Sequence, residues 1–424
     1  MSLSFVSTCR NIFKPDQRGL SLSACRREVG SLAVMMLALL LPLSVAAASI
    51  VAVLLVLCWI AEGNLNEKIR EVRSNKVALA FLAFFALNLL GLLWTQNMKW
   101  GFHITAKHWK FLLMPIVLTL AKREHLQWYA GAFVLSMVVA VVVSYLNWLG
   151  IIHYCVMDND PVAFMNHISY NVLLAFAIYL VLYALLFLDL PKGWKVTSLC
   201  LILLMSINMF ITGGRAGQVG FMALIMLICC QYFSNSIFKA LLVSGIVIPL
   251  ILGASYMASR SFRERVVMAV EEVRNYERTD DSSVGNRVVF LINSMALVQS
   301  HPVLGVGTGD FPDEYAEVNR ARSPNTPYTV NPHNEYVLVL AQFGLIGLAI
   351  FISIFYFQLK YALESPPPLR HLRMALPVLF LVIMLSESYL MVHFTSLMFC
   401  TFSGIFYKDY DGRPAVAAPA DRKR

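Results

Sequence analysis

The chain has 424 residues, of which 58% are hydrophobic and 14% are charged, and its formal net charge is +9. Because a soluble globular protein carries about a quarter charged residues, this composition excludes an ordinary soluble protein. The eight cysteines lie mostly inside apolar runs, and their spacing is typical of neither a zinc site nor a disulfide framework. We therefore expect them to be packing residues.

Apolar stretches of about 20 residues recur along the whole chain, and each is long enough to cross a bilayer. The sequence therefore predicts an all-α polytopic membrane protein with about twelve transmembrane helices. The predicted spans, in chain order, are residues 30–43, 45–61, 77–94, 107–121, 127–149, 166–188, 194–212, 216–233, 236–257, 335–361, 371–389 and 390–407.

The first predicted span resembles the core of a signal peptide, because the apolar run 31–43 is followed by the small residues of 45–49. However, the basic tail 1–29 precedes it, and a second apolar run, 50–60, follows at once. We therefore expect a retained helical hairpin rather than a cleaved signal.

Lysine and arginine are distributed unequally between the two sides that this topology defines. The termini and every second connection carry 22 of the 34 Lys and Arg residues. Under the positive-inside rule this side is the cytoplasm, and both termini are expected there. The positive net charge is then explained by the inner face of the membrane, and no nucleic-acid partner is needed.

The longest connection, residues 258–334, faces outside between the ninth and tenth spans. Its pattern predicts helices at 261–276 and 286–300. A third helix is predicted to begin at Asp310-Phe-Pro-Asp313, with Asp310 as its N-cap, and to end near residue 320. The chain thereby divides into a cytoplasmic N-tail at 1–29, spans one to nine at 30–257, the helical loop at 258–334, spans ten to twelve at 335–407 and a cytoplasmic C-tail at 408–424.

The basic residues of this loop are all arginines, namely Arg260, Arg263, Arg265, Arg274, Arg278, Arg287, Arg320 and Arg322. A guanidinium group binds phosphate oxygens in pairs and stays charged at any working pH, so this bias is typical of phosphate binding. Ten carboxylates in the same loop offer a simpler alternative, which is surface ion pairing.

Three arginines are set apart by their positions. Arg215, in Thr-Gly-Gly-Arg-Ala-Gly-Gln, lies at the outer end of the seventh span, where a charge needs a partner and the glycines allow a close approach. The alternative for Arg215 is a helix-capping turn. Arg287 follows a glycine at the start of a helix, and a helix N-terminus favours an anion. Arg265, in the first loop helix, is a third candidate.

His333 lies in the stretch Asn-Pro-His-Asn-Glu-Tyr, directly before the apolar run of the tenth span. Because imidazole titrates near neutral pH, histidine is the usual general base of enzymes. His333 shares the outer membrane boundary with Arg215, which favours a catalytic role, and a structural role at the helix start is the alternative. Glu387 and His393, near the last connection, have no role in this scheme.

Two further motifs have the composition of ligand sites. Gly305 to Asp310 reads GVGTGD, but it lacks the Lys-Ser/Thr of a P-loop, and we interpret it as a turn leading into the third loop helix. Asp158-Asn159-Asp160 offers two oxygen ligands for a cation, but its place before Pro161 favours a solvated turn. We expect neither a metal nor another cofactor.

Several features together resemble the bacterial O-antigen ligase family, within the O-antigen ligase/polymerase superfamily of membrane glycosyltransferases. They are the twelve spans, the large outer loop between spans nine and ten, the GGRAG segment, an arginine in the first half of the loop and HNEY at its end. The resemblance implies transfer of a polysaccharide from undecaprenyl pyrophosphate to a sugar hydroxyl of lipid A–core. The reaction would occur at the periplasmic face of the inner membrane, with inversion and without metal or nucleotide.

The resemblance also implies roles for individual residues. Arg215 and Arg287, with Arg265, would hold the pyrophosphate and stabilise its growing charge. His333 would take the proton of the acceptor hydroxyl, and Asn334 would position that hydroxyl.

Other members of the superfamily, and one other class of protein, remain alternatives. O-antigen polymerases typically carry two large arginine-rich outer loops, whereas the connection 150–165 is short and has no arginine. Protein O-oligosaccharyltransferases usually have an added C-terminal soluble region, which we do not expect here. A transporter of a lipid-linked glycan would need charges in the middle of several spans, and the predicted spans are nearly free of charge.

Overall fold

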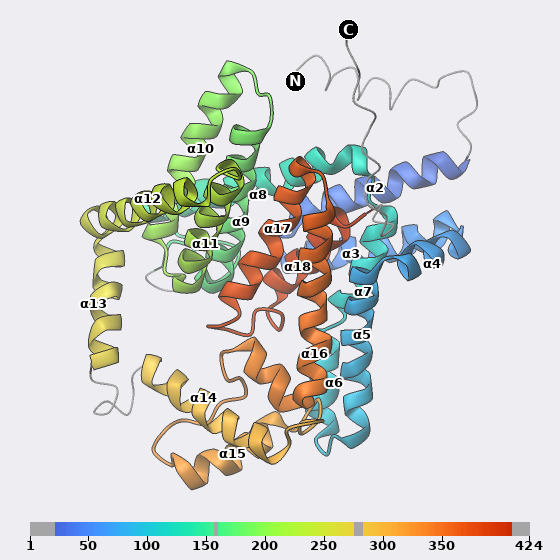
Figure 1. The fold of residues 1–424 in the computed structure, drawn as a ribbon, viewed down its shortest axis with the longest axis vertical. Helices are drawn as coiled ribbons and strands as arrows, with labels where there is room; N and C mark the ends of the chain where they lie inside the picture. The colour runs from blue at the N-terminus through green and yellow to red at the C-terminus, as the bar shows by residue number, and fades with distance from the viewer. Residues whose placement is uncertain (1–21, 157–159, 275–282, 409–424) are drawn as a thin grey trace.

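A computed structural model describes residues 22–156, 160–274 and 283–408, and its regular elements are helices (Figure 1). The first half contains α2 (Leu22–Leu40), α3 (Val45–Glu62), α4 (Leu65–Ser74), α5 (Lys76–Leu90), the 3-10 helix η1 (Gly91–Trp94), α6 (Met98–Lys107), α7 (Lys110–Leu120), η2 (Arg123–His125), α8 (Leu126–Trp148), α9 (His167–Phe187) and α10 (Lys192–Ile211). The second half contains α11 (Arg215–Tyr232), α12 (Ile237–Ala258), α13 (Arg260–Arg274), α14 (Ser283–Ser300), α15 (Phe311–Arg322), α16 (Glu335–Glu364), α17 (Pro367–Ile383) and α18 (His393–Phe406).

Eight of the described helical stretches are long and apolar enough to cross a membrane. Six are the single helices α3, α9, α10, α11, α12 and α16, and two are joined stretches, α5 with η1 and η2 with α8. They coincide with eight of the predicted spans, so the chain is an all-helical integral membrane protein. The other four predicted spans fall on α2, α7, α17 and α18. Of these, α7, α17 and α18 have 11, 17 and 14 residues, so the number twelve stays a prediction.

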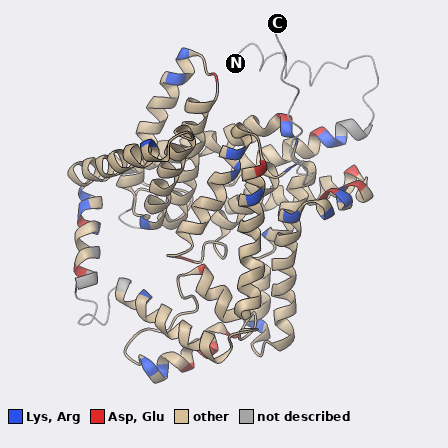
Figure 2. Cartoon of the chain, viewed as in Figure 1, with Lys and Arg blue, Asp and Glu red and all other residues tan. Residues whose placement is uncertain are grey.

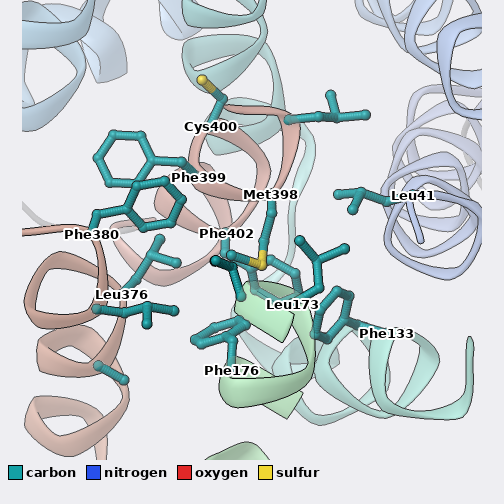
Figure 3. Close-up of a cluster of buried hydrophobic side chains, with 14 of the residues drawn as sticks. Leu41, Phe133, Leu173, Phe176, Leu376, Phe380, Met398, Phe399, Cys400 and Phe402 are labelled. Atoms are coloured by element: carbon teal, nitrogen blue, oxygen red, sulfur yellow. The ribbon is translucent and has the colours of Figure 1, made fainter. Parts of the chain in front are cut away.

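The interior of the bundle is built around α9 and the short helix α18. α9 is apolar on all sides, and 72% of its apolar membrane-spanning stretch is buried inside the bundle. This is expected for a helix that other helices surround. The ring of Phe402 in α18 lies 5.1 Å from that of Phe133 in α8 and 5.0 Å from that of Phe176 in α9 (Figure 3). This enclosure explains why a helix of 14 residues is stable inside the bundle.

α12 lies at the edge of the bundle (Figure 1). Only 11% of its apolar membrane-spanning stretch is buried inside the bundle. Apolar side chains such as Leu242, Ile246 and Leu250 are exposed. An exposed apolar surface of this length is typical of contact with lipid. Figure 2 shows the charged residues gathered at helix ends, on α2 and α4 and at the start of α10, and again on α13 to α15.

The long connection between α12 and α16 contains all three predicted helices, with boundaries within a few residues of those expected. α14 and α15 lie at the end of the molecule away from the start of α10, and α13 runs along the side of the bundle toward them (Figure 1). Gly344 (φ 61°, ψ −160°) interrupts α16. The part of α16 before this glycine directly follows His333 and Asn334 and packs on α14.

The segment GVGTGD is a packing turn, as its sequence indicated. Gly305 and Gly307 have φ angles of 67° and 105°, which glycine adopts without strain. The amide of Gly307 donates to the carbonyl of Gln342 (2.9 Å), and the hydroxyl of Thr308 donates to the carbonyl of Asn88 (2.8 Å). The segment therefore ties the loop to α5 and α16.

Asp310 directly precedes α15, but its carboxylate makes no capping hydrogen bond to that helix. It accepts hydrogen bonds from the backbone amides of Gln96 (2.8 Å) and Asn97 (2.7 Å), just before α6, and it is buried. The helix start was predicted correctly, and the capping role was wrong. Local sequence could not reveal partners that lie 214 and 213 positions away.

Replacement of Asp310 by alanine should destabilise the protein. Two backbone N–H groups would lose their acceptor, at a cost of about 1–3 kcal/mol each. We expect a lower melting temperature of the detergent-solubilised protein. Asp313→Ala is the matched control, because Asp313 is exposed and accepts from the side chain of Asn97 (2.6 Å), and its effect should stay within about 0.5 kcal/mol. Equal melting temperatures for the two variants would contradict this role of Asp310.

Candidate active site

A pocket of about 300 Å³ lies where the starts of α9 and α11, helix α13, the start of α14 and the segment after α17 meet. Its lining residues are His167, Ile168, Gly213, Gly214, Arg215, Ala216, Arg265, Met268, Arg287, Ser386, Glu387 and Tyr389. The three arginines singled out from the sequence are thus brought together, each from a different helix.

Arg215 is the first residue of α11, and its position is set by close packing against α9. The side-chain amide of Asn171 in α9 donates to the carbonyl of Gly214 (3.2 Å) and accepts from the hydroxyl of Thr212 (2.7 Å). A side chain at Gly217 would collide with the backbone of Asn171. The glycines of the GGRAG segment therefore permit this helix contact, which places Arg215 at the positive end of the α11 dipole.

Arg265 reaches the pocket from α13 and lies over Gly213, where a Cβ atom would overlap its guanidinium group. The carboxylate of Asp160 lies 3.8 Å from Arg265. Burial lowers the pKa of Arg265, Asp160 opposes this shift, and the neighbouring charge of Arg215 adds to it. Two guanidinium groups close enough to repel each other favour the binding of an anion.

Arg287, near the start of α14, faces the segment between α17 and α18. Its Nη1 donates to the carbonyl of Ser386 (3.3 Å), and its Nη2 lies 3.8 Å from the carboxylate of Glu387. The side chain is 42% exposed. Part of the guanidinium group is therefore open to a ligand.

His333 lies just before α16 in a left-handed backbone conformation (φ 53°). The side chain of Asn331 accepts from the amide of His333 (3.0 Å), which stabilises this turn. Nδ1 of His333 lies 2.7 Å from Oε2 of Glu387, and the imidazole stacks on Phe290 of α14 with centroids 5.9 Å apart. His333 is not itself among the lining residues, and Glu387, which lines the pocket, connects it to the arginines.

Glu387, unassigned on sequence grounds, joins these groups. Its Oε1 accepts from Nδ2 of Asn331 (2.8 Å) and from the amide of Ser388 (3.0 Å). Burial by itself would raise the pKa of Glu387, but the hydrogen bond and charge of His333, with help from Ser388 and Arg287, bring it below its ordinary value. The carboxylate is therefore ionised at neutral pH. The sequence offered one signal for Glu387, which is an acidic residue beside an apolar span. Such a charge needs a partner in the folded protein.

Asn334 is not among the residues that line the pocket. Its Oδ1 accepts from the amide of Val337 (3.1 Å) as the N-cap of α16, and its Nδ2 donates to the carbonyl of Leu385 (3.1 Å). These bonds tie the start of α16 to the segment after α17 and help to fix His333. The geometry shows a capping role for Asn334 and leaves its contact with substrate a prediction.

The histidine that lines the pocket directly is His167, which was not singled out from the sequence. It is the first residue of α9, and its Nδ1 lies 3.0 Å from the carboxylate of Asp160. The other members of the Asp-Asn-Asp motif, Asp158 and Asn159, lie outside the described residues. His393, which also lacked a role, begins α18 and does not line the pocket.

A comparison with curated proteins found no match. A family model described as O-Antigen ligase matches residues 200–352. This stretch runs from α10 to the middle of α16 and contains the three arginines and His333, whereas Asp160, His167 and Glu387 lie outside it. Over this stretch the chain is similar to the O-antigen ligase family, and the match supports membership of that superfamily.

Proposed function

We propose that this chain is a glycosyltransferase that moves O-antigen polysaccharide from undecaprenyl pyrophosphate to lipid A–core in lipopolysaccharide assembly. The observation that carries the proposal is the convergence of three arginines on one pocket at the ends of membrane spans, together with Glu387, a lining residue that pairs with His333. The family match supports a reaction of the ligase or polymerase type. The positive-inside rule puts the pocket on the periplasmic face of the bacterial inner membrane.

The arginines suit a diphosphate leaving group. Guanidinium groups donate paired hydrogen bonds to phosphate oxygens and remain charged. Arg215, Arg265 and Arg287 come from three helices, so positive charge surrounds the pocket before any substrate binds. Such preformed charges stabilise the negative charge that develops as the bond between sugar and diphosphate breaks. The arginines would thereby take the role that a metal ion has in many other phosphate-handling enzymes.

His333 and Glu387 suit the activation of an acceptor hydroxyl. A carboxylate beside Nδ1 favours the tautomer with its proton on Nδ1, which leaves Nε2 to accept a proton. As the acceptor oxygen bonds to the anomeric carbon, Nε2 of His333 takes the hydroxyl proton, and the electron pair of the broken bond leaves with the diphosphate. Direct displacement inverts the anomeric centre and needs the base and the leaving group on opposite faces of the sugar. Glu387 is a positioning residue, since it acts through His333. Asn334 would help to position the acceptor hydroxyl.

The position of the pocket suits two substrates that are both lipids. Arg215 begins one membrane-spanning helix, and His333 lies just before another. A head group anchored in the outer leaflet arrives at this level of the protein. α13 and α14 supply Arg265 and Arg287 from the side of the long connection and border the pocket there.

An O-antigen polymerase is the second candidate, since it would use the same donor and another undecaprenyl-linked glycan as acceptor. The short connection between α8 and α9, without arginine, favours the ligase. A protein O-oligosaccharyltransferase would instead transfer the glycan to a protein hydroxyl. A transporter is disfavoured, because its charges would line a path through the bundle, whereas these arginines gather in one pocket at helix starts.

The central test is a transfer assay with purified protein, undecaprenyl-pyrophosphate-linked glycan and lipid A–core in detergent with EDTA, read as glycosylated product on a gel. His333→Ala should lower the rate by about 10²–10⁴ because the base is lost. Arg215→Ala should lower it by about 10²–10³ because leaving-group stabilisation is lost. His301→Ala and Arg322→Ala are matched controls with near-normal rates, since both residues are exposed and outside the pocket.

Each alternative gives a different result in this assay. Product formed only when a second undecaprenyl-linked glycan is the acceptor would identify a polymerase. Near-normal activity of His333→Ala would mean that the base lies elsewhere and that the stretch before α16 is only a helix start. Loss of wild-type activity with EDTA would contradict the metal-free mechanism.

Glu387→Gln tests the orienting carboxylate. The variant keeps the size of the side chain and removes its charge, so we expect a rate loss of about 10²–10⁴. Because the pKa of Glu387 lies below its ordinary value of 4.5 in the folded protein, its pairing stabilises the protein above about that pH. This stabilisation is lost as the pH falls through the folded-state pKa. Melting temperatures of wild type and variant should therefore differ near neutral pH and converge in acid, and a difference that persists in strong acid would argue against the ionised pair.

A further inference from the structure

A second histidine–carboxylate pair borders the pocket, separate from that of His333 and Glu387. His167 lines the pocket, and its Nδ1 lies 3.0 Å from Oδ2 of Asp160. Asp160 is only 5% exposed and is not itself a lining residue. The proposed mechanism has so far left this pair without a role.

Asp160 is held firmly in place. Its Oδ2 accepts from the amide of Gly213 (3.1 Å), its Oδ1 accepts from the amide of Val162 (3.3 Å), and the guanidinium of Arg265 lies 3.8 Å away. A buried carboxylate with these partners has little freedom to rotate. It therefore presents a fixed negative charge to both His167 and Arg265 at the pocket wall.

The surroundings of His167 are positive. His167 is the first residue of α9, and Arg215 is the first residue of α11. The two helix starts are so close that a Cβ atom at Gly214 would collide with the carbonyl oxygen of His167. Each helix N-terminus adds partial positive charge. The N-termini of α9 and α11, together with Arg215 and Arg265, therefore add positive charge near the imidazole, on the side of the pocket where Asp160 lies.

We propose that His167, which lies beside the buried carboxylate of Asp160, is a further catalytic residue that contacts the diphosphate leaving group. This inference rests on the proposed function. As the bond between the anomeric carbon and the diphosphate oxygen breaks, its electron pair goes to that oxygen. The protonated imidazole of His167 donates a hydrogen bond to the diphosphate and adds its charge to that of the arginines. The proton of the acceptor hydroxyl goes to His333, so His167 keeps its own proton in this step.

The two carboxylates also orient the substrates. Glu387 presents its charge to the pocket, whereas Asp160 is buried behind the wall. A diphosphate is repelled by Glu387, so it binds toward His167, and the acceptor hydroxyl lies toward His333. The charged and titratable groups that face His167 or share its pocket are Asp160, Arg215, Arg265, Arg287, Glu387 and Tyr389.

The test is binding of inorganic pyrophosphate to the purified full-length protein in detergent, by calorimetry at about pH 6 and about pH 8.5, since imidazole groups gain a proton toward acid. At the lower pH, His167→Gln should bind about tenfold more weakly than wild type, because a charge-assisted hydrogen bond is lost. At the higher pH the two should bind alike. His167→Arg, which stays charged, should match wild type at the lower pH and bind more tightly than wild type at the higher pH.

His301→Gln is the matched control and should bind like wild type at both pH values, because His301 is exposed and outside the pocket. Equal binding by His167→Gln and wild type at the lower pH would overturn the proposal. If His167→Gln melts below wild type, the result for His167→Arg decides the question. The proposal is then overturned if His167→Arg binds pyrophosphate no more tightly than wild type at the higher pH.

The transfer assay separates this inference from the proposed function. A wild type that binds pyrophosphate through His167 but transfers no glycan would contradict the function and leave the diphosphate site standing. A wild type that transfers glycan, with unchanged rate and unchanged pyrophosphate binding in His167→Gln, would contradict only the role of His167.

Discussion

The buried carboxylate of Glu387 is the contact on which the geometry of the pocket depends. Removing a carboxylate from water costs several kcal/mol unless charges and hydrogen bonds compensate. Its two oxygens face His333, Asn331, Arg287 and the amide of Ser388. These partners come from the start of α16, from α14 and from the segment after α17. Satisfying one carboxylate therefore fixes three elements relative to one another, and the position of the proposed base follows from it.

Asp160 has the same function for three other elements. It accepts a hydrogen bond from the amide of Gly213 before α11 and lies within ion-pair distance of His167 at the start of α9 and Arg265 in α13. Each histidine of the site thus has a carboxylate beside Nδ1, and each carboxylate has an arginine 3.8 Å away. Charges held in this way need little rearrangement when a diphosphate forms, which is the condition for effective electrostatic catalysis.

Local sequence signals were sufficient for most helices and for the arginines of the site, and they failed where a contact joins distant segments. The loop helices could be predicted because each has its own apolar face or capping sequence, and Arg215 because it begins a helix after two glycines. The role of Glu387 depends on a contact across 54 positions, and that of Asp160 on one across 53. No local pattern encodes such pairings, because they depend on how the spans pack.

The pocket lies where helices end, and this location has a physical cause. In a membrane protein, non-helical backbone is tolerated where other groups satisfy its polar atoms. The segment after α17 meets this requirement through Glu335, whose carboxylate accepts from the amide of Leu390 (2.9 Å) and whose amide donates to the carbonyl of Met384 (3.0 Å). Asp160 and Glu387 do the same for neighbouring amides. Two of the three carboxylates that satisfy the interrupted backbone, Asp160 and Glu387, also lie beside a histidine Nδ1, so stability and the geometry of this site depend on the same side chains.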